Sequence, residues 1–162
     1  KDVNAQKAAV VAISLGGYYA PRIASMEKRY KACVAWGACW DYHATWKKRV
    51  AASMKTELSV PGHHIMWVFN TKNYEETFKK LENFRLDGIV QKMKCPFLLT
   101  HGIDDKQVPT RDARKLFNAV GSKDKTLKIF TVKEGGSQHC QRDNLSLGVT
   151  YIADWLQEKL KA

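Results

Sequence analysis

Residues 8–17 read Ala-Ala-Val-Val-Ala-Ile-Ser-Leu-Gly-Gly, a short apolar run that ends in a serine, a leucine and two glycines. An uninterrupted apolar run of this length is typical of a strand that is buried on both faces, as in a parallel sheet. A helical stretch at 18–26 follows, in which Pro21 has to occupy the first turn, and then a second apolar run at 31–37. Strand, tight turn, helix and strand form a βαβ unit, which predicts an α/β fold with a mostly parallel sheet and flanking helices.

The alternation of strands and helices is interrupted in the middle of the chain and resumes afterwards. Residues 40–54 and 74–84 have helical spacing, with an apolar and aromatic run at 63–69 between them. Beyond them the pattern predicts further strands and helices in alternation, over 97–100, 111–120, 127–132 and 147–160. We therefore expect a first core segment over 1–39, a helical insertion or lid over 40–90, and a second core segment over 91–162.

The composition is that of an ordinary globular domain and excludes several classes of protein. Of the 162 residues, 44% are hydrophobic and 27% charged, which does not fit a disordered, collagen-like or coiled-coil chain. No apolar run approaches the about 18–20 residues that span a bilayer, so no membrane partner is expected. The formal net charge is +11, but the basic residues are spread along the chain. We read them as a solvated surface and expect no nucleic-acid partner.

The cysteines and histidines do not form a recognisable metal or disulfide pattern. The chain has four scattered cysteines and no Cys-x-x-Cys pair, so neither a zinc ribbon nor a thioredoxin motif is predicted. Scattered cysteines of this kind favour a reducing, cytoplasmic location. The adjacent pair His63-His64 points in different directions and has no carboxylate at helical spacing. We expect no metal and no cofactor.

The segment Ala12-Ile13-Ser14-Leu15-Gly16 matches the nucleophile elbow Gly-x-Ser-x-Gly, with alanine in place of the first glycine. The chemistry needs a serine on a sharp strand-to-helix turn, because that turn exposes the hydroxyl oxygen. Small flanking residues let the backbone make the turn. The same turn would direct the Leu15 N–H to a developing oxyanion. Taken alone, a serine between small residues fits an ordinary turn equally well.

Two further loops follow predicted strands, and each carries a residue that could work with Ser14. His-Gly-Ile-Asp-Asp-Lys-Gln-Val-Pro occupies 101–109, and Glu-Gly-Gly-Ser-Gln-His-Cys occupies 134–140. Serine, then aspartate, then histidine, each after a strand, is the chain order of α/β-hydrolases. We therefore predict Ser14 as the nucleophile and His139 as the base, with Asp104 or Asp105 orienting the imidazole.

Several motifs together resemble one family. They are Ser-Leu-Gly-Gly-Tyr-Tyr-Ala-Pro-Arg at 14–22, Ala-Cys-Val-Ala-Trp-Gly at 32–37, Trp-Asp-Tyr-His at 40–43 and Gly-Gly-Ser-Gln-His-Cys at 135–140. This set resembles the fungal yellowish-green-type polyketide-shortening hydrolases of the naphthalenediol melanin pathway. It is more distantly similar to bacterial dihydroxypseudooxynicotine hydrolase and to fermentation-respiration-switch-like esterases. The resemblance spans nearly the whole chain.

The resemblance implies a reaction, a substrate class and one choice of residue. It implies a serine hydrolase that cleaves a carbon–carbon bond between carbonyl groups, a retro-Claisen reaction that releases a short acyl fragment from an aromatic polyketide. The pattern His-Gly-x-x-Asp-x-x-Val-Pro resembles the acid loop of esterases and prolyl-oligopeptidase-type hydrolases, and it implies Asp105 as the acid. Side chains after the first two strands are candidates for substrate contacts. They are Tyr18, Trp36, Trp40, Asp41 and Tyr42.

The position of Ser14 near the start of the chain carries a further expectation. In α/β-hydrolases the nucleophile strand lies in mid-sheet, and a loop before it supplies the second oxyanion N–H. Only 13 residues precede Ser14, so we expect the C-terminal part of an α/β-hydrolase fold whose N-terminal remainder is its partner. A carboxylester hydrolase or peptidase with the same triad, and a non-catalytic binding module, remain alternatives. The sequence also leaves a homodimer open.

Overall fold

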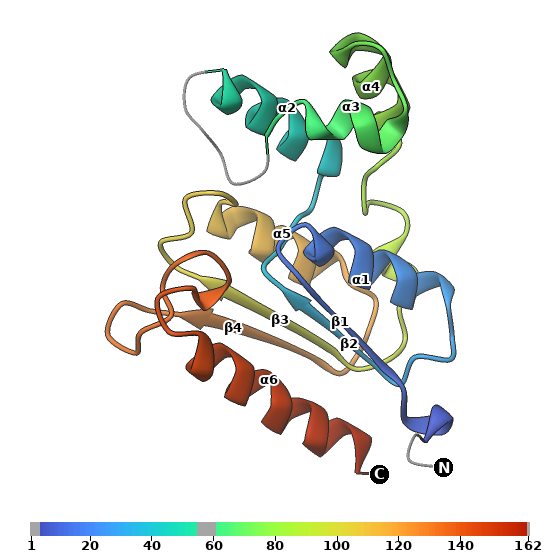
Figure 1. Cartoon of the computed structure of the whole chain (residues 1–162). Helices are drawn as coiled ribbons and strands as arrows, with labels where there is room; N and C mark the ends of the chain where they lie inside the picture. Colours follow the sequence, from blue (N-terminus) through green and yellow to red (C-terminus); the bar gives the residue numbers. More distant parts are fainter. Residues whose placement is uncertain (1–3, 55–60, 162) are drawn as a thin grey trace. The chain divides into compact units, whose positions relative to one another are not determined.

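A four-stranded parallel sheet forms the centre of the computed structural model, which describes residues 4–54 and 61–161 (Figure 1). Its strands are β1 (Ala9–Ile13), β2 (Ala32–Trp36), β3 (Phe97–Gly102) and β4 (Lys125–Phe130), and they lie side by side in that order. All three neighbouring pairs are parallel. The predicted α/β fold with a parallel sheet is confirmed.

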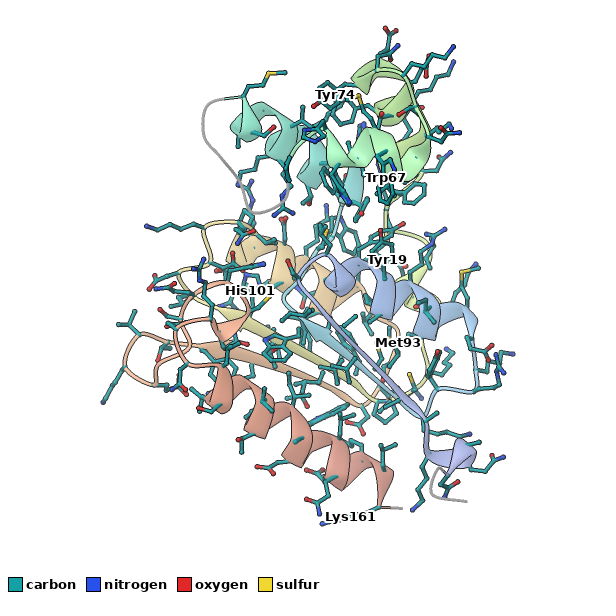
Figure 2. All side chains as sticks on the ribbon, in the orientation of Figure 1. Tyr19, Trp67, Tyr74, Met93, His101 and Lys161 are labelled. Carbon is teal, nitrogen blue, oxygen red and sulfur yellow. The ribbon has the colours of Figure 1, made fainter. Side chains whose placement is uncertain are left out.

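Helices cover both faces of this sheet, as Figure 1 shows: α1 (Gly16–Met26) and α5 (Thr110–Ala119) on one side and α6 (Leu145–Leu160) on the other. On the α6 side, Val34 and Leu98 pack against Ile152 and Trp155. Successive side chains of a strand point to opposite faces, so a strand covered on both sides has to be apolar throughout. This accounts for the apolar runs of β2 and β3, whose side chains are almost all buried (Figure 2). In β1, however, Val11 and Ile13 are exposed, so the first run is not buried on both faces as expected.

Short 3₁₀ turns accompany these elements, and several of the predicted boundaries are wrong. The turns are η1 (Ala5–Lys7), η2 (Val90–Lys92) and η3 (His139–Gln141). Helix α1 begins at Gly16, two residues earlier than expected, so Pro21 lies inside the helix and not in its first turn. Strand β3 continues through His101 to Gly102, because β4 pairs with it as far as Gly102. Strand β4 covers Lys125–Phe130 and not 127–132, and α6 begins at Leu145 and not at 147.

The chain divides into two compact units, Lys1–Trp40 with Leu86–Ala162, and Asp41–Arg85. The second unit contains α2 (Tyr42–Ser53), α3 (His64–Phe69) and α4 (Tyr74–Leu81). Inside it the Phe84 ring lies 6.0 Å from the Tyr42 ring and 5.3 Å from the Phe69 ring. Residues 55–60 of the predicted insertion lie outside the described residues. Among those that are described, no helix is long and apolar enough to cross a membrane.

Candidate active site

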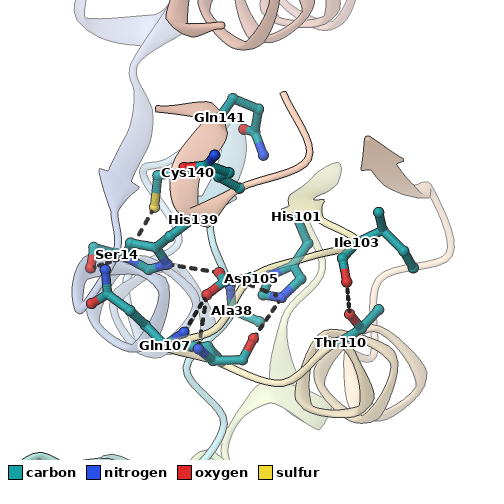
Figure 3. Close-up of polar contacts among 12 residues, drawn as sticks. Ser14, Ala38, His101, Ile103, Asp105, Gln107, Thr110, His139, Cys140 and Gln141 are labelled. Atoms are coloured by element: carbon teal, nitrogen blue, oxygen red, sulfur yellow. Dashed lines mark hydrogen bonds and ion pairs between the residues drawn. The ribbon is translucent and has the colours of Figure 1, made fainter. Parts of the chain in front are cut away.

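Three residues from three separate loops meet at the carboxyl ends of the strands. Ser14 follows β1, Asp105 follows β3 and His139 follows β4, and parallel strands bring these ends to one edge of the sheet. Ser14 Oγ lies 2.7 Å from His139 Nε2, and His139 Nδ1 lies 2.7 Å from Asp105 Oδ2 (Figure 3). The structure therefore brings together the serine, the histidine and the aspartate that the sequence singled out.

The serine sits on a sharp turn between β1 and α1. Its φ is +58°, in the left-handed region that costs a non-glycine residue about 1–3 kcal/mol. The Ser14 N–H donates to the Trp36 carbonyl at 2.8 Å, and the Ser14 carbonyl accepts from the Gly17 N–H at 2.8 Å. These two bonds fix the turn from both sides. The strained residue, Ser14, is thus the one whose hydroxyl has to project from the edge of the sheet.

Leu15 is the N-cap residue of α1, next to Ser14. Within residues 4–54 and 61–161 its N–H has no hydrogen-bond acceptor. An N–H in this position adds to the positive end of the helix dipole. The arrangement is that of a donor for a developing oxyanion, and this role of Leu15 stays a prediction.

Asp105 is held in place by its own loop. Its side chain is buried, and Oδ1 accepts from the Gln107 N–H at 2.8 Å and the Val108 N–H at 2.9 Å. Burial acts to raise the pKa of Asp105, but the bonds from His139 and the Val108 N–H outweigh it and hold this pKa below its ordinary value. The neighbouring Asp104 is exposed. Of the two carboxylates, Asp105 is the one that bonds the imidazole.

A second histidine, His101, lies beneath this carboxylate, and sequence reasoning gave it no role. It is fully buried in the first unit (Figure 2). Its Nε2 donates to the Val108 carbonyl at 3.0 Å, Nδ1 accepts from the Ala38 N–H at 3.3 Å, and Nε2 lies 3.7 Å from Asp105 Oδ2. Burial lowers the pKa of His101, although Asp105 opposes the shift. A neutral His101 thus ties the acid loop to the end of β2. The His-Gly pair that opens the acid-loop motif was its only sequence signal.

The histidine loop is also fixed by residues that the sequence analysis did not single out. The Asp143 carboxylate accepts from the Ser137 N–H at 2.9 Å and the Gln138 N–H at 3.0 Å. Cys140 Sγ lies 3.5 Å from His139 Nε2. Burial raises the pKa of this thiol to about 12, so it stays protonated and does not compete with Ser14 as a nucleophile.

A cavity of about 750 Å³ opens beside the imidazole, between the acid loop and the histidine loop. It is lined by Ile103, Asp104, Asp105, Lys106, Gln107, Ser137, Gln138, His139 and Arg142. Two of these side chains, Lys106 and Arg142, are cationic. In the described part of the chain, no group of three His, Cys, Asp or Glu side chains is placed to hold a metal ion.

None of the five predicted substrate-contacting residues lines this cavity. In the first unit, Tyr18 is fully buried in α1, the Trp36 indole N–H is bonded to Gln141, and Trp40 is 8% exposed with the Lys115 ammonium 5.0 Å from its ring centroid. These side chains are engaged inside the first unit, and their contact with substrate stays a prediction.

The other two candidates, Asp41 and Tyr42, belong to the second unit. The Asp41 carboxylate accepts from the Ala44 N–H at 2.8 Å and so caps α2. Tyr42 is buried beside the Trp46 and Phe84 rings. Both side chains make contacts that stabilise their own unit, and their contact with substrate stays a prediction.

Comparisons with known proteins agree with this geometry. The chain is 25% identical to Hydrolase acrC of Aspergillus aculeatus over 98% of its length, and 24% identical to the 20-hydroxy-prefusarin hydrolase FUS2 of Gibberella moniliformis over 96%. It spans 44% of the length of each. These matches confirm the predicted resemblance to fungal hydrolases, whereas a place in melanin synthesis stays a prediction.

Solved structures show the same fold. A crystal structure of the 2,6-dihydroxy-pseudo-oxynicotine hydrolase superposes with a TM-score of 0.71 at 24% identity, covering 98% of this chain and 42% of that one. The structure named AbyA5 superposes with a TM-score of 0.70 at 20% identity, covering 96% and 43%. The family described as the prolyl oligopeptidase family matches residues 1–162. With its sheet, its elbow and this match over its whole length, the chain belongs to the prolyl oligopeptidase family, and its fold is the C-terminal part of an α/β-hydrolase.

Proposed function

We propose that the protein is a serine hydrolase that cleaves a carbon–carbon bond next to a carbonyl group, with Ser14, His139 and Asp105 as its catalytic triad. The observation that carries the proposal is the unbroken chain of two 2.7 Å contacts from Ser14 Oγ through His139 to Asp105 Oδ2. A serine bonded to an imidazole that is itself oriented by a buried carboxylate is an activated nucleophile.

The first half of the reaction follows from this geometry. Ser14 Oγ attacks a carbonyl carbon of a β-dicarbonyl segment, and its proton passes to His139 Nε2. The Leu15 N–H stabilises the resulting oxyanion. When the tetrahedral adduct collapses, the carbon–carbon bond breaks, and its electron pair leaves on the α-carbon as an enolate. The neighbouring carbonyl delocalises that charge. The proton on Nε2 then passes to the enolate, so Ser14 carries the acyl group.

The second half regenerates the enzyme. His139 Nε2 accepts a proton from a water molecule, whose oxygen attacks the acyl-serine. The C–O bond to Ser14 breaks, and the proton on Nε2 returns to Ser14 Oγ. One water is consumed, and a carboxylic acid is released. Asp105 remains a carboxylate throughout, because its lowered pKa keeps it ionised near neutral pH, and it stabilises the imidazolium in both halves.

The choice of a carbon–carbon bond rests on the motif resemblance described above, and the names of the relatives bear on the class of substrate. The Gibberella relative is named for 20-hydroxy-prefusarin and the structural relative for 2,6-dihydroxy-pseudo-oxynicotine, each a specific compound and not a peptide. This favours a small, oxygenated substrate such as an aromatic polyketide. A carboxylester hydrolase uses the same triad, and the experiment below separates the two.

We also propose that the intact protein completes this site with residues outside these 162. The chain spans 44% of the curated relatives it matches, and β1 lies at one end of the strand order. Val11 and Ile13 on that strand are 43% and 50% exposed, which is high for apolar residues of a nucleophile strand. A segment that covers β1 could supply the second oxyanion donor.

The test uses the intact protein with a fluorophosphonate probe, an aryl β-diketone and a p-nitrophenyl ester. We expect labelling at Ser14, cleavage of the diketone to a ketone and an acid, and incorporation of one oxygen from ¹⁸O-water into the acid. Ser14→Ala is the control for all three readouts. Labelling with ester turnover and no diketone cleavage would establish the esterase instead. A folded protein that takes up no probe would overturn serine catalysis.

A further inference from the structure

Trp36, the last residue of β2, is bonded to the candidate nucleophile Ser14 and to the two residues that follow the candidate base His139. Its carbonyl accepts from the Ser14 N–H at 2.8 Å and from the Cys140 thiol at 3.4 Å. Its indole N–H donates to Gln141 Oε1 at 2.7 Å. Cys140 and Gln141 directly follow His139 (Figure 3). One residue therefore contacts the turn that carries the serine and the two residues that directly follow His139.

The backbone after His139 needs such support. Cys140 and Gln141 have φ values of +50° and +52°, so two consecutive non-glycine residues occupy the left-handed region. Conformations of this kind persist only where the surrounding structure holds them, and they concentrate at functional sites. Gln141 is fully buried, and its side-chain oxygen accepts a hydrogen bond from the Trp36 indole N–H.

Trp36 is itself held by the core. Its ring packs on the cluster formed by β2, β3 and α6. Gly148 of α6 makes room for it: a Cβ on Gly148 would lie 3.2 Å from Trp36 Cζ2 and 3.2 Å from Gln141 Oε1. The indole ring therefore packs between the sheet and α6, and this packing fixes the direction of its N–H.

We propose that Trp36 is a positioning residue, which sets the distance between His139 Nε2 and Ser14 Oγ through its bonds to Gln141, Cys140 and the Ser14 N–H. This assigns Trp36 a role different from the substrate contact that the sequence suggested, since its N–H and its ring are already engaged. The inference rests on the proposed function for its kinetic readout, but its structural readout is independent of any reaction.

The experiment compares Trp36→Phe, Gln141→Met and the double variant in the intact protein. Trp36→Phe keeps an aromatic ring and removes the N–H; Gln141→Met keeps the side-chain length and removes the acceptor. Trp155→Phe is the matched control, because Trp155 of α6 lies in the same cluster. Its N–H donates at 3.3 Å to Thr126 Oγ1 near the start of β4, at the opposite end of the strand from the triad. If Trp36→Phe does not fold, Gln141→Met removes the same bond and leaves the Trp36 ring in place.

Each single variant should lower kcat and the rate of fluorophosphonate labelling about 10- to 100-fold, because small displacements of a catalytic group have effects of this size. KM should stay within about twofold, since substrate binding is not what is lost. The double variant should lose no more than the worse single variant, because both substitutions break one bond. Trp155→Phe should match the wild type.

A proton NMR measurement separates this inference from the proposed function. The proton between His139 Nδ1 and Asp105 gives a low-field resonance, which we expect Trp36→Phe and Gln141→Met to shift or broaden and Trp155→Phe to leave unchanged. Unchanged resonance and rates in both variants, or purely additive losses in the double variant, would overturn the positioning role. A wild type that takes up no probe would overturn serine catalysis, while the resonance would still report on Trp36.

Discussion

Ala12 and Gly16 approach each other so closely across the elbow that a Cβ on Gly16 would lie 2.5 Å from the Ala12 Cβ. The elbow pattern has a glycine at both positions, and this chain keeps only the second. The missing Gly16 side chain is what makes room for the Ala12 methyl group. The turn therefore accommodates alanine at position 12 in place of glycine, and Ser14 keeps its strained conformation.

Gly16→Ala should therefore destabilise the protein by about 1–3 kcal/mol, the range for overpacking in a close-packed site. The double variant Ala12→Gly/Gly16→Ala should recover most of that loss, because one of the two facing positions then again lacks a Cβ. Urea unfolding of the intact protein measures both. Equal destabilisation of the single and the double variant would show that the two positions do not interact.

Replacement of Ser14 should separate activity from stability. Ser14→Ala and Ser14→Gly should both lose fluorophosphonate labelling and at least about 10³-fold in turnover, because the nucleophile is gone. Ser14→Gly should nevertheless be more stable than Ser14→Ala by about 1 kcal/mol, since glycine relieves the strain at φ +58°. Thermal unfolding of the two inactive variants gives the comparison. If Ser14→Gly were less stable than Ser14→Ala, the backbone of Ser14 would not be strained as we infer.

Asp105→Asn should lower turnover by about 10⁴-fold while the fold is kept. An asparagine oxygen can still accept from the Gln107 and Val108 N–H groups, but its amide would face His139 Nδ1 and favour the wrong tautomer. Asp104→Asn is the matched control on the neighbouring, exposed carboxylate, which lines the cavity but does not bond His139, and it should lower turnover far less than Asp105→Asn does. If Asp104→Asn lost the activity and Asp105→Asn kept it, the assignment of the acid would be reversed.

His101 should make the stability of the fold depend on pH. The pKa of its imidazole is lowered by burial from an ordinary value of 6.5. Between that value and the lower folded-state pKa, the unfolded chain binds a proton that the folded chain does not. The neutral His101 imidazole therefore stabilises the fold fully above its ordinary pKa, and this stabilisation is lost as the pH falls through the window.

A His101→Gln variant should show a flatter decline of the unfolding temperature between about pH 8 and about pH 5 than the wild type. Glutamine can replace both bonds, donating to the Val108 carbonyl and accepting from the Ala38 N–H. His63→Gln, at an exposed histidine, is the control that removes a titratable group outside the core. Identical slopes for wild type and His101→Gln would refute the link between this buried imidazole and acid sensitivity.

The fold and the triad could be predicted because each depends on a local pattern. Unbroken apolar runs indicate strands of a parallel sheet, and Ser-Leu-Gly-Gly after the first of them indicates an elbow. The choice of Asp105 over Asp104 came from the resemblance of this loop to the acid loop of esterases and prolyl-oligopeptidase-type hydrolases. In the structure Asp105 is buried against His139, whereas Asp104 is exposed. Boundaries were less accurate, as at Pro21, because helix length depends on neighbours in space.

The sequence by itself determined the parallel α/β order and which serine, aspartate and histidine follow strand ends, because hydrophobic periodicity and turn-forming residues act over a few positions. Only the tertiary structure decided what holds that triad together. Trp36 and Gln141 are 105 positions apart and His101 and Ala38 are 63 apart, so their bonds exist only once β2, β3 and the histidine loop have packed. The same packing gives the Trp36 indole N–H its acceptor, Gln141 Oε1, which no neighbour of Trp36 in the chain supplies.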